Sequence, residues 1–363
     1  MKKPSKLKRE LARLGQQIAD LPERFLGPIA RAKYEANRAQ TVISTQGARD
    51  LTPKLAVFLL FQRGDLPASI KVTCDWLAEN GYSVLCVANG GLTEVAKTAL
   101  LPHVWRLIER PNFGYDFGGY REGILHLKTQ KIAPETLLIL NDSIWLPTRP
   151  HSDLIARLEA MPAPVAGLVL NQRERAKGRY AKAGFVESYF YRISGDFASS
   201  DAFATYWNSL KITDDKRLTI QRGEKGFSRM LVETLVEFEA LLTRASFAKR
   251  LATCGTDELT QYLRFAALPT PDLRDLRDTA LATNARAPML EAIEAILKSH
   301  GPAGAFNIMA LADQHLDVLK KRPAPICQSG RAAYLAALRA GILPAPAPEI
   351  LAEIEALAAK ETA

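Results

Sequence analysis

The strongest constraint on the fold is a set of continuous apolar runs, each as long as one β-strand, separated by segments with helical spacing. Residues 54–61 read Lys-Leu-Ala-Val-Phe-Leu-Leu-Phe, and residues 82–88 and 136–141 have the same character. An apolar run without alternation indicates a strand buried on both faces, as in a parallel sheet covered by helices. Helices are expected at 68–80 and 117–128. This alternation predicts a doubly wound α/β sheet.

After residue 142 the pattern is less regular. We expect a strand at 165–170, an extended segment at 185–193 and a helix at 226–244. The apolar positions of that helix fall on one face: Met230, Leu231, Leu235, Phe238 and Leu242. From residue 246 the chain is rich in Ala and Leu and is interrupted by Pro, which is typical of short helices. We therefore predict a helical N-terminal segment at 1–50, an α/β domain at 51–245 and a helical C-terminal extension at 246–363.

Several classes of protein are disfavoured by what the sequence lacks. It contains no run of 18 apolar residues, so no transmembrane helix is expected. The first residues, Met-Lys-Lys-Pro-Ser-Lys, lack the apolar core of a signal peptide, which favours a cytoplasmic protein. The four cysteines are scattered, so neither a disulfide framework nor a zinc site is expected. Neither a G-x-S-x-G motif nor a P-loop is present, which disfavours the hydrolases that use them.

The N-terminal segment carries much of the positive charge. The whole chain has a net charge of +9, and residues 1–40 contain ten Lys or Arg against four Asp or Glu, or +6. Leu7, Leu11, Leu14, Ile18 and Leu21 recur at helical spacing among these charges. Such a basic amphipathic helix can lie on an anionic membrane surface. Alternatively, its Leu stripe packs on the main domain. Nucleic-acid binding is not expected, because no stacking aromatics are interleaved with the basic residues.

Two motifs in the first half of the chain point to a ligand site. Residues 110–120 read Arg-Pro-Asn-Phe-Gly-Tyr-Asp-Phe-Gly-Gly-Tyr, and residues 137–147 read Leu-Leu-Ile-Leu-Asn-Asp-Ser-Ile-Trp-Leu-Pro. The second motif is a predicted buried strand that runs into polar residues. Ligands of open α/β sheets gather at the carboxyl ends of the parallel strands. Asp142, at such an end, is placed to hold a metal ion, a metal-bound phosphate or a sugar hydroxyl.

The pairing of N-x-G-Y-D-F-G with L-N-D-S resembles the bacterial rhamnan synthesis protein F family over residues 54–235. Members of that family are presumed glycosyltransferases of surface-polysaccharide assembly. The resemblance implies a GT-A-like glycosyltransferase domain at 51–245. It also implies transfer of a sugar, such as L-rhamnose from a dTDP donor, to a growing polysaccharide or a lipid-linked acceptor. The rival hypothesis is a non-catalytic protein of the same fold that binds nucleotide sugars or glycans.

The resemblance assigns the two motifs to donor binding. The residues it implies are Asn112, Gly114, Asp116, Asn141, Asp142 and Ser143. Asp142 is also the implied ligand of Mg²⁺ or Mn²⁺, an ion that needs only one or two protein carboxylates when phosphates fill other positions. A D-x-D pattern is absent, so metal dependence stays open. The structural alternatives are an Asx turn at Asn141 and Asp142 and helix capping by Asp116.

The resemblance also suggests residues for catalysis and for the acceptor. Glu224 stands just before a predicted helix, where transferases of this class often place the general base, and Asp116 is the second candidate. The alternative for Glu224 is a favourable interaction with the helix dipole. Ser188 and Tyr189 are implied to lie at the acceptor site, although a packed aromatic strand fits them equally well. The basic loop 171–182 is a candidate for contact with a diphosphate or a lipid-linked acceptor.

Overall fold

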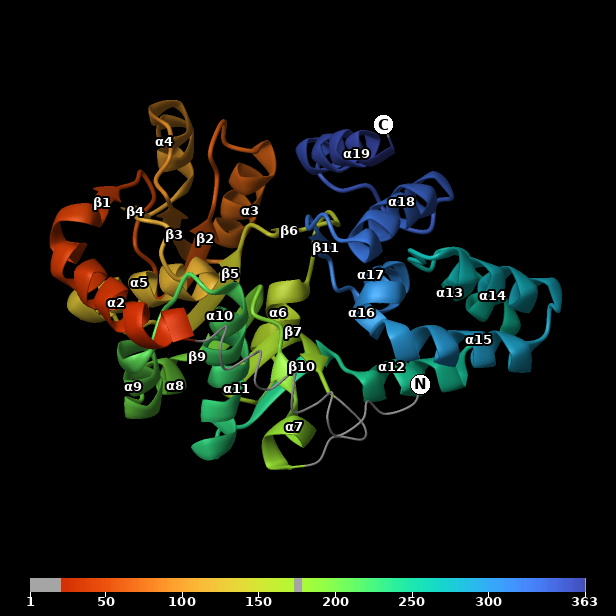
Figure 1. Cartoon of the computed structure of the whole chain (residues 1–363). Coiled ribbons are helices and arrows are strands. Elements are labelled where there is room, and N and C mark those ends of the chain that lie inside the picture. The colour runs from red at the N-terminus through yellow and green to blue at the C-terminus, as the bar shows by residue number, and fades with distance from the viewer. Residues whose placement is uncertain (1–20, 173–177, 363) are drawn as a thin grey trace.

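The computed structural model describes residues 21–172 and 178–362. Within these residues a nine-stranded sheet has the order β1-β4-β3-β2-β5-β9-β7-β10, with β8 paired to β7 (Figure 1). The strands are β1 (Ile43–Gln46), β2 (Lys54–Leu60), β3 (Tyr82–Asn89), β4 (Arg106–Arg110), β5 (Thr136–Asn141), β7 (Val165–Asn171), β8 (Phe185–Val186), β9 (Phe190–Ser194) and β10 (Phe238–Leu242).

Most strands of this sheet point in one direction. β2 pairs in parallel with β3 and β5, β3 with β4, and β7 with β10. β9 is antiparallel to both β5 and β7, so β7 and β10 run in the same direction as the central strands. Among the described strands of this sheet, only β1, β8 and β9 run the other way. The predicted α/β fold with a mostly parallel sheet is confirmed.

Helices bury both faces of the sheet, which explains the continuous apolar runs. Leu55, Val57 and Leu59 of β2 pack in one cluster with α5 (Tyr115–Thr129). The intervening residues of β2 pack on the opposite face with α3 (Ala68–Glu79). The other helices of this part are α2 (Leu21–Thr41), α4 (Glu94–Leu100), η1 (Leu101–His103), α6 (Leu154–Glu159), α7 (Arg179–Ala183), α8 (Gly195–Ala198), α9 (Asp201–Ser209), α10 (Lys216–Arg222) and α11 (Glu224–Glu233).

The C-terminal part of the chain is helical and lies beside the half of the sheet that contains β7 and β10 (Figure 1). It returns one short strand, β11 (Leu319–Lys320), which pairs antiparallel with β6 (Ile144–Trp145), inside the second motif. Its helices are α12 (Arg244–Thr253), α13 (Thr256–Arg264), α14 (Pro271–Ala282), α15 (Arg286–Ser299), α16 (Pro302–Ala305), α17 (Asn307–Gln314), α18 (Pro325–Arg339) and α19 (Pro348–Thr362).

The helix predicted at 226–244 is wrong in its second half. α11 ends at Glu233, Leu235 has a left-handed backbone with φ of 59°, and β10 follows. Parallel pairing with β7 buries Ala240 and Leu242, the inward residues of this edge strand. A short apolar run fits both the helical and the strand period, and the pairing with a distant strand decided between them.

The N-terminal helix α2 packs against α5. Tyr34 is buried and donates a hydrogen bond to Glu122 Oε2 at 2.8 Å, and Arg38 pairs with the same carboxylate at 2.6 Å. The predicted basic helix at residues 7–21 lies outside the described residues except for Leu21, which begins α2. Across the described residues, no helix is both long enough and apolar enough to span a membrane.

Candidate functional site

The second motif forms a tight turn where β5 ends. Asn141 Oδ1 accepts hydrogen bonds from the backbone N–H of Ser143 at 3.1 Å and from its hydroxyl at 2.5 Å. This is the Asx turn considered above as the structural alternative. Asn141 Nδ2 also donates to Asp116 Oδ2 at 3.1 Å. Asn141 therefore joins the two motifs, which are separated in the sequence but adjacent at the carboxyl end of β5.

Asp142 connects the ends of two neighbouring parallel strands. Its Oδ2 accepts hydrogen bonds from the backbone N–H of Phe61 at 2.8 Å and from Gln62 Nε2 at 2.6 Å, both just after β2. Burial raises the pKa of Asp142, while these two donors and the Lys321 ammonium lower it. The carboxylate therefore holds the loop after β2 in place and remains partly exposed at the crevice.

The first motif is shaped by a buried arginine. Arg110 ends β4, and its guanidinium donates to Asn89 Oδ1 at 2.5 Å, to the Phe113 carbonyl at 2.6 Å and to the Tyr34 hydroxyl at 2.9 Å. Gly114 follows with φ of 87°, and a Cβ there would lie 2.8 Å from the Cβ of Ile212. Glycine is therefore required at the entry to α5.

The predicted donor residues of this loop are placed differently from one another. Gly114 is the N-cap residue of α5, so the alternative that Asp116 caps this helix is wrong; Asp116 lies in its first turn. Asn112 is exposed at the loop surface. Burial and the nearby charges of Asp142 and Glu224 raise the pKa of Asp116 to about 6, although Arg322 and Lys216 oppose this shift.

Glu224 and the predicted acceptor residues also meet. Glu224 begins α11, and its Oε1 accepts a hydrogen bond from the backbone N–H of Ser188 at 2.8 Å. The Tyr120 hydroxyl donates to the Ser188 carbonyl at 2.9 Å, which ties this segment to α5. Burial raises the pKa of Glu224, and the hydrogen bonds from Ser188 lower it. A carboxyl with a raised pKa is suited to accept a proton near neutral pH.

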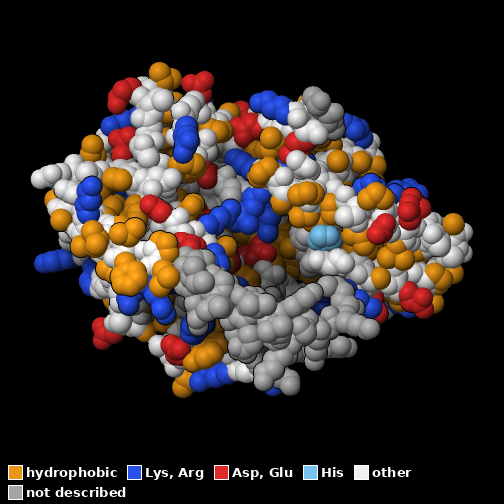
Figure 2. Space-filling model, viewed as in Figure 1, with side chains coloured by type: hydrophobic (Ala, Val, Ile, Leu, Met, Phe, Trp, Pro, Cys, Tyr) orange, Lys and Arg blue, Asp and Glu red, His pale blue; other side chains and the backbone are white. Residues whose placement is uncertain are grey.

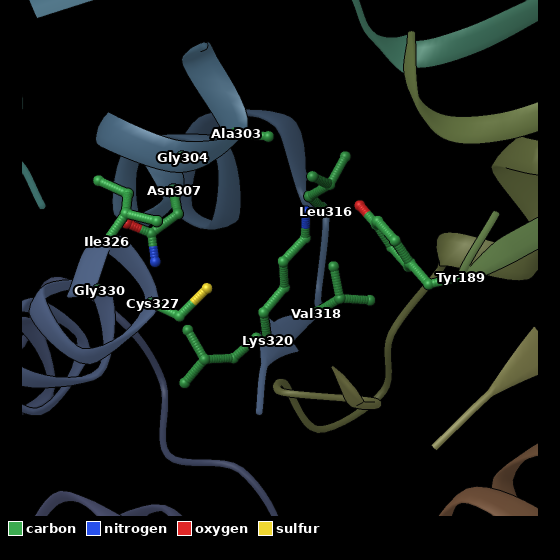
Figure 3. Close-up of a pocket in the computed structure, with 11 residues that line it drawn as sticks. Tyr189, Ala303, Gly304, Asn307, Leu316, Val318, Lys320, Ile326, Cys327 and Gly330 are labelled. Carbon is green, nitrogen blue, oxygen red and sulfur yellow. The ribbon is translucent and has the colours of Figure 1, made fainter. Parts of the chain in front are cut away.

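Tyr189 is buried beside Ser188, and its ring faces a small cavity. The cavity has a volume of about 80 Å³, and the Lys320 ammonium lies 4.9 Å from the ring centroid (Figure 3). The wall of the cavity is mostly apolar and includes Leu316, Val318 and Ile326. Tyr189 thus packs at the boundary between the sheet and the C-terminal helices, directly before β9, and its contact with an acceptor stays a prediction.

The sequence analysis missed three cationic residues that reach this site from the C-terminal part. Lys320 pairs with Glu187 at 2.6 Å, and the backbone N–H of Lys321 donates to the Ser143 carbonyl at 2.8 Å. Arg322 is exposed and lowers the pKa of both Asp116 and Glu224. Figure 2 shows Lys and Arg side chains gathered with acidic ones in the recess between the two parts. The signal was present as Leu-Asp-Val-Leu followed by Lys-Lys-Arg-Pro, a short β-branched and apolar stretch ahead of a basic cluster, inside a segment assigned to helices.

The donor atoms around Asp142 do not fit a metal centre built by the protein alone. Across residues 21–172 and 178–362, no three His, Cys, Asp or Glu side chains come together as a metal site. One oxygen of Asp142 already accepts two N–H donors, and a lysine ammonium acts on the same carboxylate. A divalent cation would therefore depend on ligands from the substrate.

The basic loop is described only in part. Arg173, Arg175 and Lys177 lie outside the described residues, while Lys182 is exposed. Arg179 donates to the Val232 carbonyl at 2.6 Å, at the end of α11. Contact of this loop with a ligand stays a prediction.

This chain is similar to a known protein family. The model of the family described as "Rhamnan synthesis protein F" matches residues 84–261. The predicted family resemblance is confirmed over these residues. They include both motifs, Ser188, Tyr189 and Glu224, but end before the segment that carries Arg322.

A curated relative from Sinorhizobium fredii, "Uncharacterized protein y4gN", is 34% identical over 220 residues, which are 61% of this chain and 56% of the relative. The chain thus spans little more than half the length of that relative. Among solved structures, the mannosyltransferase PcManGT from Pyrobaculum calidifontis, in complex with GDP-Man and Mn²⁺, is 14% identical, with coverage of 95% and 97% and a TM-score of 0.32. TarS from S. aureus in complex with UDP is 10% identical, with coverage of 79% and 92% and a TM-score of 0.26. Both TM-scores are below 0.5, too low for either structure to indicate the function of this chain.

Proposed function

We propose that this protein is a glycosyltransferase that uses a nucleotide-sugar donor. The observation that carries the proposal is the meeting of family-matched residues from separate segments at the carboxyl ends of β2 and β5. Asn141 contacts Asp116, Asp142 holds the loop after β2, and Glu224 contacts the Ser188 backbone. This is the edge at which open α/β sheets bind their ligands. In this proposal, carboxylates with raised pKa values accept hydrogen bonds from the sugar hydroxyls, and one carboxylate acts as the general base.

The proposed reaction is a direct displacement at the anomeric carbon. The acceptor hydroxyl gives its proton to Glu224, and its oxygen forms a bond to that carbon. The bond from the same carbon to the donor's diphosphate oxygen breaks, and the electron pair leaves with the nucleoside diphosphate. The hydrogen bond from the Ser188 N–H orients the Glu224 carboxylate for this role. Configuration at the anomeric carbon is inverted.

We further propose which sugar is transferred and where in the cell the protein lies. The family's description as a rhamnan synthesis protein supports L-rhamnose as the transferred sugar and a surface polysaccharide or its lipid-linked precursor as acceptor. The basic, Leu-striped N-terminal sequence supports a peripheral position on the inner face of a cell membrane. If a divalent cation such as Mg²⁺ or Mn²⁺ takes part, Asp142 is the one residue proposed to hold it, with donor phosphates as the other ligands.

A panel of UDP-, GDP- and dTDP-sugars tests this function. One class of donor is expected to raise the melting temperature, because a ligand that binds only the folded state stabilises it. The same donor is expected to be hydrolysed slowly without acceptor. Stabilisation without hydrolysis or transfer would favour the binding protein instead. Absence of binding to every member of the panel would overturn the proposal.

A further inference from the structure

The segment Lys320–Arg322 is fixed against the second motif by backbone contacts. β11 pairs with β6, and the Lys321 N–H donates to the Ser143 carbonyl at 2.8 Å, next to Asp142. On its other side, the buried Arg331 donates to the carbonyls of Lys320 at 2.9 Å and Arg322 at 3.1 Å. Pro323 further restricts the backbone of Arg322 to extended conformations. The chain therefore presents Arg322 in a defined position.

The three cations of this segment have different surroundings. Lys320 is paired with Glu187, and Lys321 donates to Ser69 Oγ at 3.1 Å. Among the described residues, the Arg322 guanidinium makes no hydrogen bond or ion pair. It nevertheless acts electrostatically on Asp116, Glu224 and Tyr189, which come from three different segments of the site. Its five N–H donors are thus available within the crevice.

We propose that Arg322 binds the diphosphate of the nucleotide-sugar donor and, with Lys321 behind it, supplies the positive charge that stabilises the leaving diphosphate. This inference rests on the proposed function and deepens it. A guanidinium matches phosphate oxygens with two parallel hydrogen bonds, which a lysine cannot do. This positive charge can take the place of a divalent cation, for which the residues around Asp142 provide too few ligands. Asp142 is then left to bind a hydroxyl of the donor sugar.

Calorimetric titration of the full chain with UDP, GDP and dTDP tests the inference, in the presence and absence of EDTA. Arg322→Ala is expected to weaken the preferred nucleotide about tenfold or more, the loss typical of one charge-assisted hydrogen bond. Arg322→Lys is expected to recover part of the affinity. Because Arg322 is exposed, its substitution leaves the core intact, and an unchanged melting temperature verifies this.

Arg339→Ala is the matched control. It removes the same charge from an exposed position at the far end of α18, about 20 Å along the helix from its start. Nucleotide affinity within twofold of wild type is expected for this control, and for the wild-type protein in EDTA. Wild-type affinity in Arg322→Ala, or loss of wild-type binding in EDTA, would overturn the inference while leaving the proposed function standing. Failure of the wild-type protein to bind any nucleotide or nucleotide sugar would overturn both.

Discussion

The α/β sheet and the C-terminal helical part contribute to the same crevice in different ways. The sheet supplies acidic and amide groups, Asp116, Asn141, Asp142 and Glu224, from strand ends and helix starts. The C-terminal part supplies cations from Lys320–Arg322, carried on a two-residue strand. The carboxylates accept hydrogen bonds from neighbouring segments of the sheet part. The cations reach them only because β11 pairs with a strand more than 170 residues earlier in the chain. A site divided in this way needs both parts for its charge balance.

The largest expected effect tests the contribution of the sheet. Asp142→Ala is expected to abolish measurable binding of the nucleotide sugar, because it removes both the carboxylate and the acceptor for the Phe61 N–H. Asp142→Asn is the matched control: its oxygen still accepts that hydrogen bond, so it separates loss of charge from loss of loop structure. Calorimetry with the sugar donor and with its free nucleotide gives the comparison. Undiminished donor binding by folded Asp142→Ala would remove the sheet's motif from the donor site.

Glu224→Gln tests whether the sheet also supplies the base. Transfer is expected to fall roughly 10²- to 10⁴-fold, the usual contribution of a positioned proton acceptor. Donor affinity should be retained, because the amide oxygen can still accept from the Ser188 N–H. Steady-state transfer assays and donor titrations report the two quantities. If transfer is unchanged, Glu224 is only a helix-terminal carboxylate and Asp116 becomes the candidate base; if donor affinity is lost, Glu224 belongs to the donor site.

Arg331→Ala tests whether the C-terminal part must be rigid. The substitution removes the ion pair with Glu361 and the donors to the Lys320 and Arg322 carbonyls. The free energy of unfolding is expected to fall by on the order of 3 kcal/mol, because buried polar partners are left unpaired. Urea unfolding measures this, with Arg339→Ala as the exposed control. Nucleotide affinity should fall as well. Full affinity in the destabilised protein would mean that the C-terminal part supports the fold and not the site.

Asp116→Asn tests the electrostatic balance of the crevice. The pKa of Asp116 is raised from its usual 3.8 to about 6, chiefly by burial, so the folded protein binds this proton more tightly than the unfolded chain. Its contribution to stability is therefore present below pH 3.8 and lost as pH rises to about 6, by on the order of 3 kcal/mol. Relative to wild type, the asparagine protein should gain stability between these pH values and keep that gain at neutral pH. Parallel urea-unfolding profiles from pH 4 to pH 8 would contradict this.

The smallest expected effect on catalysis concerns the N-terminal sequence. Deleting residues 2–20 should release the protein from anionic vesicles, because each nearby Lys or Arg contributes about 1 kcal/mol of attraction. Donor hydrolysis should persist, since the deletion spares α2, whose Tyr34 and Arg38 hold Glu122 of α5. A deletion through residue 40 would break these contacts and confuse the two effects. Vesicle sedimentation measures the binding, and equal sedimentation of both proteins would favour a packing role for the Leu stripe.

The sequence alone determined the central sheet and the residues that line its carboxyl edge. The runs at β2, β3 and β5 are apolar throughout because both faces are buried, and that pattern is legible without the fold. Gly114 was identified from the motif, and its positive φ and close approach to Ile212 supply the physical reason for glycine. These features depend on local chain geometry, which a sequence pattern records directly.

The tertiary structure alone decided how the distant segments meet. Residues 238–242 became a strand because β7 was available as a partner, and β11 formed because β6, within the second motif, offered an edge for pairing. The same pairing brought Arg322 within electrostatic reach of Asp116 and Glu224. Short strands derive their stability from such non-local partners and carry little periodic signal of their own. The cationic side of the crevice was therefore present in the sequence as residues, but not as a site.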